Sequence, residues 1–105
     1  MIKVDSSDFT FQHIVFLSNR DLWLLLAEND NVTILQACQK ADDLVLFRIR
    51  SVFSKTAVEY FNDDLNKFCG TSEAKVIEAR KRMVSVLSEL YEHGRLYDWD
   101  AKYAS

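Results

Sequence analysis

The chain has 105 residues, which is enough for one ordinary domain and too few for two independent hydrophobic cores. Hydrophobic residues make up 49% of it and charged residues 28%, a composition typical of globular proteins rather than disordered chains. The formal net charge of -3 argues against a strongly basic nucleic-acid binder, and no apolar run approaches the ~20 residues that span a bilayer. We therefore expect a single domain over residues 1–105, with a leader at 1–8 and a tail at 97–105.

Residues that break regular secondary structure are rare, because the chain has two glycines and no proline. A β-sandwich or barrel needs many turns rich in these residues. We therefore predict an all-α fold, a compact bundle of five or six short helices. The two cysteines, Cys38 and Cys69, show no CxxC spacing, and we expect free thiols in a reducing cytoplasm.

The first helices are expected within and after a short apolar segment, residues 9–17. We expect this segment to begin as extended chain and to continue into a short helix. Ser18, with Asp21 three residues later, predicts the start of the next helix. Residues 23–27 are all apolar, which predicts that this helix is covered on most of its sides.

Two further helices are expected over residues 31–40 and 43–53. The apolar positions that recur in the first of them, and define its predicted buried face, are Val32, Leu35 and Cys38. The polar positions expected on its other sides are Thr33, Gln36 and Gln39. At about 100° per residue, one arc of the second helix carries Val45, Leu46, Ile49, Val52 and Phe53.

The last two helices have clear boundary signals. Ser54 is well placed as the N-cap of a helix over residues 55–68, and Gly70 and Thr71 fit a stop and the next N-cap. The predicted apolar stripe of that helix is Ala57, Phe61, Leu65 and Phe68. A longer helix is expected over residues 72–93, ended by Gly94. Its predicted inner face is Val76, Ala79, Met83, Val86, Leu87 and Leu90.

Side chains that could carry catalysis are few. His13 lies in an apolar segment, where a hydrogen-bonded structural histidine is the expected role, and His93 lies near the end of a helix. The sequence contains no glycine-rich phosphate loop, no HExxH or EF-hand pattern, and no zinc-type spacing of cysteines and histidines. We therefore predict that the protein is not an enzyme and carries no metal or other cofactor.

The most conspicuous polar residues are the adjacent Asp63 and Asp64, with Glu59 one helical turn earlier. If Phe61 faces inward, Asp63 points about 200° and Asp64 about 300° away from it. A solvated helix face is the simplest interpretation of these charges, and an acidic recognition ridge formed by the three residues is the sharper one. Adjacent aspartates on a helix diverge, so a magnesium or calcium site is not expected here.

A second charged surface could be formed by the run Arg80, Lys81 and Arg82. Acidic residues interleave with this run, Glu78 among them, which is typical of a solvated helix face. Binding to nucleic acid would need a coherent basic face, and the acidic balance of the chain disfavours it.

Four segments of the chain occur in an order that resembles a known family. They are FTFQHIVFLSNRDLWLLLAEND, ILQACQKADD, FSKTAVEYFNDDL and VIEARKRMVSVLSELYEHGRL, and together they cover about residues 8–96. Their order and spacing resemble the final, stator-facing helical subdomain of the C-terminal domain of the flagellar motor switch protein family, FliG. The most specific feature is the SKxAxExxxDDL pattern, followed by a long helix that ends in EHG.

The resemblance implies roles for several positions. Asp63 and Asp64 match the acidic pair of the family's torque-generating helix, whereas Thr56 stands where the family has an arginine. Gln39 stands at a position where the family has a lysine. Because both basic positions lack a charge, the resemblance implies a domain that binds the stator without transmitting torque, or that binds something else.

The place of the family's phenylalanine-rich hinge between two subdomains is occupied by Phe9 and Phe11. The upstream subdomain has no counterpart in this chain. We therefore expect this hinge-like segment to fold back on the bundle or to leave an apolar patch that self-associates. The starting methionine and the divergent tail favour a free-standing small domain over a piece of a longer rotor protein.

The function implied by the resemblance is non-catalytic protein–protein interaction in or around the flagellar motor, with Glu59, Asp63 and Asp64 as the contact residues. The expected partner is the cytoplasmic loop of the stator or another rotor component. We expect no small-molecule substrate and no membrane insertion, and a location in the cytoplasm at the face of the basal body. One alternative is a FliG-like adaptor or regulator outside the motor, and another is a helical nucleic-acid binder.

Overall fold

The computed structural model describes residues 9–96, and this part of the chain is helical without a β-strand. Its elements are a 3-10 helix η2 (Phe11–Phe16) and the α-helices α1 (Asn19–Ala27), α2 (Asn31–Ala37), α3 (Asp43–Arg50), α4 (Lys55–Lys67) and α5 (Glu73–Glu92). The predicted all-α class and the number of helices are therefore confirmed. The leader and the tail predicted from the sequence lie outside the described residues.

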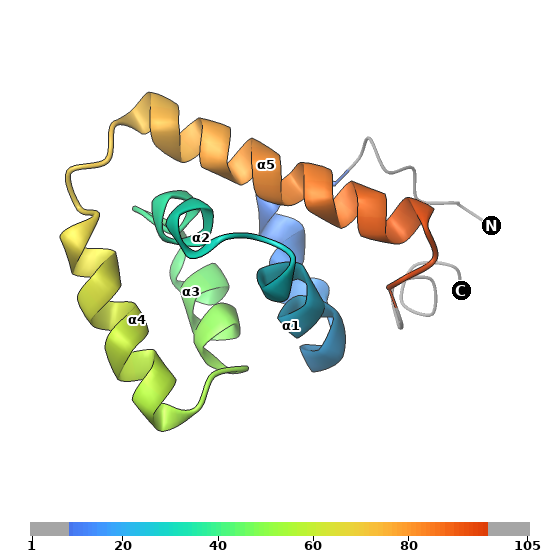
Figure 1. The fold of residues 1–105 in the computed structure, drawn as a ribbon, viewed down its shortest axis with the longest axis horizontal. Helices are drawn as coiled ribbons and strands as arrows, with labels where there is room; N and C mark the ends of the chain where they lie inside the picture. The colour runs from blue at the N-terminus through green and yellow to red at the C-terminus, as the bar shows by residue number, and fades with distance from the viewer. Residues whose placement is uncertain (1–8, 97–105) are drawn as a thin grey trace.

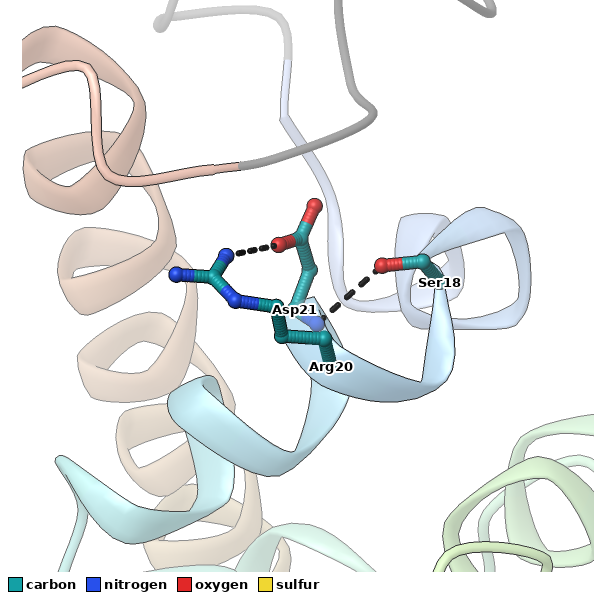
Figure 2. A network of polar contacts seen from close by, with 3 residues as sticks. All are labelled: Ser18, Arg20 and Asp21. Atoms are coloured by element: carbon teal, nitrogen blue, oxygen red, sulfur yellow. Dashed lines mark hydrogen bonds and ion pairs between the residues drawn. The ribbon is translucent and has the colours of Figure 1, made fainter.

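Short polar side chains start every α-helix, because their oxygens accept a hydrogen bond from one of the first free backbone N–H groups. Ser18 accepts from the N–H of Asp21 at the start of α1, as Figure 2 shows. Ser54 does the same for Ala57 in α4, which confirms both predicted N-caps. Asp30 and Asp42 start α2 and α3 in the same way.

The start of α5 differs from the prediction by one residue. Ser72, not Thr71, accepts the hydrogen bond from the backbone N–H of Lys75. Thr71 instead donates its hydroxyl to the carbonyl oxygen of Phe68, over 2.7 Å, and so helps to end α4. At the other end of α5, Gly94 adopts the left-handed conformation with φ of 67°, as expected of a residue that terminates a helix.

The core lies between α5 and the shorter helices. Figure 1 shows α5 along one side of the molecule, α4 at the far edge, and α2 and α3 between α4 and α1. Five of the six predicted inner residues of α5 are buried, namely Val76, Ala79, Met83, Leu87 and Leu90, and the sixth, Val86, is half-buried. From the other elements, the fully buried apolar side chains include Ile14, Leu17, Leu22, Leu25, Val45 and Ile49.

The apolar run in α1 is less covered than the sequence predicts. Leu22, Leu25 and Leu26 are buried, but the Trp23 side chain is 60% exposed. At about 100° per residue these three leucines fall within one arc of the helix, whereas Trp23 lies about 100° around the helix from Leu22, outside that arc. The expectation that α1 is covered on most sides is therefore wrong.

Helix α2 is shorter than predicted, and its buried surface is wider than the predicted face. Leu35 and Cys38 are buried as predicted, but the other positions differ. It ends at Ala37, and the following turn brings Lys40 to a φ of 54°, which no helix continues through. Thr33 and Gln39, predicted to lie away from the core, are buried, while Val32 is 50% exposed. The reason is that α2 lies between α5 and α4, so its environment has no single apolar side.

Arg80 of α5 binds backbone carbonyl groups at the C-terminal end of α2. Its guanidinium donates to the carbonyl oxygens of Ala37 and Gln39 at 2.8 and 2.9 Å. It also lies over the ring of Phe11, with 5.0 Å between the Arg80 Cζ atom and the ring centroid. These contacts satisfy carbonyls that the end of a helix leaves free, and they connect three elements.

Candidate protein-binding surface on helix α4

Helix α4 lies at the edge of the molecule and exposes most of its circumference (Figure 1). Phe61 is its one buried residue among those described, and Ala57, Leu65 and Phe68 of the predicted stripe are half-buried. The Phe61 ring lies 5.5 Å from the ring of Phe53 between centroids. The apolar contact of α4 with the body is therefore centred on this side chain, as the sequence predicts.

Two polar contacts supplement this apolar one. The buried amide of Gln39 donates to the carbonyl oxygen of Leu65 at 2.9 Å and to that of Leu35 at 3.1 Å, which connects α4 to α2. Arg50 of α3 donates its Nε–H to Asn62 of α4, also over 2.9 Å. Helix α4 is thus held from both neighbouring helices, while its outer side remains open.

The predicted acidic ridge lies on that open side, but its three members differ in their surroundings. Glu59 and Asp63 are exposed, whereas Asp64 is half-buried. The Asp64 carboxylate lies 3.5 Å from the Lys67 ammonium group, and the Asp64 side chain keeps 46% of its surface exposed. The adjacent aspartates diverge as expected, and they face different parts of the surface.

Asp64 lines a groove between α2 and α4 that the sequence reasoning missed. The groove has a volume of about 260 Å³ and is lined by Asn31, Ile34, Leu35, Phe53, Ala57, Tyr60, Phe61 and Asp64. Glu59 and Asp63 are not part of this lining. The position of α4 relative to α2 creates the groove, and no periodicity within a single helix indicates it.

The two positions at which the resemblance implies basic residues present no charge at this surface. Thr56 is exposed on α4, and Gln39 is buried with its amide engaged by two carbonyl oxygens. The neighbouring lysines, Lys55 and Lys40, are exposed. Lys55 lies about 100° around α4 from Thr56, so its side chain leaves the helix on a different side.

The hinge-like residues Phe9 and Phe11 lie against the body. Phe9 is 5% exposed, and its ring meets that of Tyr91 edge to face at a centroid distance of 5.3 Å. Phe11 is half-buried beneath the Arg80 guanidinium. Of the two expected outcomes for this segment, the structure has the one in which it folds back on the bundle.

His13 has the structural hydrogen bond that the sequence predicts for it. Its Nδ1 accepts a hydrogen bond from the backbone N–H of Thr10 at 2.7 Å.

The run of basic residues on α5 does not form one surface. Arg80 turns inward to the end of α2, and Arg82 pairs with Glu78 on its own helix at 2.9 Å. Lys81 is exposed. The three side chains therefore offer no coherent basic face for a nucleic acid.

Neither thiol pairs with another. Cys38 is buried and Cys69 is exposed, and both are free, as expected. Burial raises the pKa of the Cys38 thiol to about 12.

Within residues 9–96, no group of three or more candidate side chains is arranged to hold a metal ion. In the same range, no helix combines the length and hydropathy needed to cross a membrane.

Comparison with known proteins places the chain in a family. Residues 2–97 match the family model of the FliG C-terminal domain. The flagellar motor switch protein FliG of Borreliella burgdorferi is 28% identical over 94 residues, and the protein of that name from Aquifex aeolicus is 25% identical over 94 residues. Each match covers 90% of this chain but only 27% and 29%, respectively, of the two relatives. Because the family model matches nearly the whole chain, this protein belongs to the FliG C-terminal domain family.

Proposed function

We propose that this domain is a non-catalytic protein-interaction module of the flagellar rotor, located at the cytoplasmic face of the basal body. Its partner is the cytoplasmic loop of the stator, and its contact residues are Glu59, Asp63 and Asp64. The observation that carries the proposal is an acidic, outward face on a helix that packs on the body through a single buried residue, Phe61. Membership of the FliG C-terminal domain family supports the same assignment.

The physical basis of the proposal is electrostatic complementarity. Exposed carboxylates contribute little to folding, because water solvates them well in both the folded and unfolded states. Against a basic partner they steer diffusional encounter and set the orientation of the complex. The exposed Glu59 and Asp63 suit long-range attraction, and the half-buried Asp64 suits a close ion pair.

The test is a binding titration of the stator's cytoplasmic loop at two ionic strengths, roughly 50 and 300 mM, which differ in screening length. Asp63→Lys/Asp64→Lys is expected to slow association and to weaken its salt dependence. Glu89→Lys, a charge reversal at an exposed position of α5, is the matched control and should leave binding nearly unchanged. Undiminished binding by the double variant at low salt would exclude the ridge as the contact surface.

A second candidate function, an adaptor or regulator outside the motor, rests on the uncharged Thr56 and the buried Gln39. A domain without basic groups at these two positions keeps only the acidic residues of the charge pattern that the resemblance implies. In either role we expect the domain to fail to restore rotation when it replaces the equivalent domain in a motor, whereas only the rotor role predicts binding to the stator's cytoplasmic loop. Binding to that loop would therefore exclude the adaptor role.

A further inference from the structure

We propose that the groove between α2 and α4 receives a large apolar side chain of the protein partner, and that an arginine or lysine next to that side chain pairs with Asp64. This inference rests on the proposed function, and it adds a second recognition element to the charged ridge. The segment that binds would thus carry both an apolar anchor and a cation, whereas the exposed ridge alone would select only for positive charge.

The floor of the groove is apolar and comes from both helices. Ile34 and Leu35 contribute from α2, Ala57 and Phe61 from α4, and Phe53 from the segment between α3 and α4. The volume of about 260 Å³ is below the roughly 300–1,000 Å³ of sites for drug-sized ligands, and it suits one or two side chains. Burying a leucine, methionine or phenylalanine of a partner there would remove apolar surface from water on both molecules.

The rim of the groove has the composition of an interface that binds cations. Tyr60 is 68% exposed at this rim, and tyrosine is among the residues most enriched at energetically dominant interface positions. Asp64 lies at the same rim, and Glu59 and Asp63 follow on the outer side of the same helix. An arginine can extend its apolar stem along Tyr60 and place its guanidinium on the Asp64 carboxylate.

The basic residues near the groove leave Asp64 accessible. Lys67 approaches the Asp64 carboxylate at 3.5 Å, but its side chain is 73% exposed, so a partner's cation can replace it at small cost. Arg50 donates its Nε–H to Asn62, and its guanidinium lies 5.9 Å from the centre of the Phe61 ring, so its described contacts are with these two residues and not with Asp64. The charge that remains for a partner at this rim is negative, which selects a basic segment.

The test separates the groove from the ridge by filling the groove without changing any charge. Ala57→Leu adds bulk to the groove lining and keeps a strong helix former in α4. Ala74→Leu is the matched control, the same change at an exposed position of α5. Tyr60→Ala, at an exposed rim position, is the second groove variant, and thermal unfolding followed by circular dichroism verifies that each variant folds.

Two probes are titrated into the isotope-labelled chain and followed by NMR. One is the stator's cytoplasmic loop, and the other is a short synthetic helix with leucines flanked by arginines, compared with its leucine-to-serine analogue. We expect the stator loop and the leucine-containing helix to shift the amide signals of residues 31–35 and 57–64. We expect Ala57→Leu and Tyr60→Ala to weaken binding roughly tenfold or more, and Ala74→Leu to leave it unchanged.

The outcomes distinguish the two proposals. If Ala57→Leu and Tyr60→Ala bind the stator loop as the wild type does, while Asp63→Lys/Asp64→Lys does not, the ridge stands and the groove is overturned. If the synthetic helix binds in the groove but the stator loop does not bind, the groove stands and the stator assignment fails. Equal binding of the leucine and serine helices would also overturn the groove, because charge alone would then explain the affinity.

Discussion

Gln39 shows how a single position can change its role between the sequence pattern and the folded chain. Its amide lies between two carbonyl oxygens, on Leu35 and Leu65, and only 8% of the residue is exposed. A side chain in this place contributes hydrogen bonds within the domain and presents nothing to a partner. At the scale of single residues, burial thus decides whether a polar group serves stability or recognition.

We predict that Gln39→Leu lowers the free energy of unfolding by about 1–2 kcal/mol, because the carbonyl oxygens it serves lose a buried donor. Gln36→Leu, the same change at a half-buried position of the preceding helix α2, should change it by about 0.5 kcal/mol or less. Urea unfolding of the two variants measures the difference. Equal effects would show that the Gln39 hydrogen bonds contribute nothing specific.

We predict that the two thiols, Cys38 and Cys69, react at very different rates because one is buried and the other is exposed. Reaction with an alkylating reagent requires the thiolate, and the pKa of the buried Cys38 is raised to about 12. We expect Cys69 to react at the rate of an exposed thiol and Cys38 to react only when the domain unfolds, as followed by mass spectrometry. Fast modification of Cys38 in the folded protein would contradict its burial.

The raised pKa of Cys38 also predicts how the free energy of unfolding changes with pH. Above about pH 9 the unfolded chain ionises Cys38 while the folded chain keeps it protonated, so the folded state binds more protons. The contribution of this group to stability is therefore fully present below pH 9 and is lost as the pH rises toward 12. Cys38→Val should remove this part of the alkaline decline in the free energy of unfolding.

At the scale of elements, α4 is held to the rest of the described chain by few contacts. Its neighbours hold it through one buried ring and two side-chain hydrogen bonds, from Gln39 and Arg50, while its polar side remains open. Such an arrangement can present a charged face and a groove at the same time. Because few residues hold α4 on the body, each of them contributes a large share of the stability of this packing.

We predict that Phe61→Ala lowers the free energy of unfolding by about 3–5 kcal/mol, because it removes most of a buried aromatic side chain. Tyr60→Ala, an aromatic truncation at the adjacent exposed position, should cost far less. Denaturant unfolding gives the total effect, and amide hydrogen exchange tests whether α4 opens first. An unchanged unfolding midpoint for Phe61→Ala would refute the packing of this helix.

At the scale of the whole molecule, the ends of the described chain meet. Phe9, at its beginning, lies against Tyr91 near the end of α5, and Arg95 pairs with Glu28 at the end of α1 at 3.1 Å. The segment before α1 therefore closes the body and is part of the core. In this chain the hinge-like phenylalanines serve packing.

We predict that Phe9→Ser lowers the unfolding temperature strongly, whereas Phe47→Ser, at a position 71% exposed on α3, changes it little. The double variant Phe9→Ser/Phe11→Ser should be less stable still. Size measurements over a range of concentrations test whether the exposed core then drives self-association. Equal stability of Phe9→Ser and the wild type would contradict the folded-back position of this segment.

Much of the helical architecture can be read from the sequence because its signals are local. Ser18 and Ser54 act as N-caps through oxygens that reach backbone groups only three residues away. The stripe of α5 repeats with the period of a helix, so Val76, Met83 and Leu87 are found without knowledge of the neighbours. The acidic residues of α4 are likewise placed relative to Phe61 by helix geometry alone.

Only the tertiary structure decided which face of each helix packs against a neighbouring helix. Trp23 is apolar yet exposed, and Thr33 and Gln39 are polar yet buried, because the packing of neighbouring helices overrides the pattern within one helix. The inward role of Arg80 depends on the free carbonyl oxygens at the end of α2, more than 40 residues earlier. The groove beside Asp64 is lined by residues of both α2 and α4, so it depends on how these two helices are placed in space, which no local rule of sequence gives.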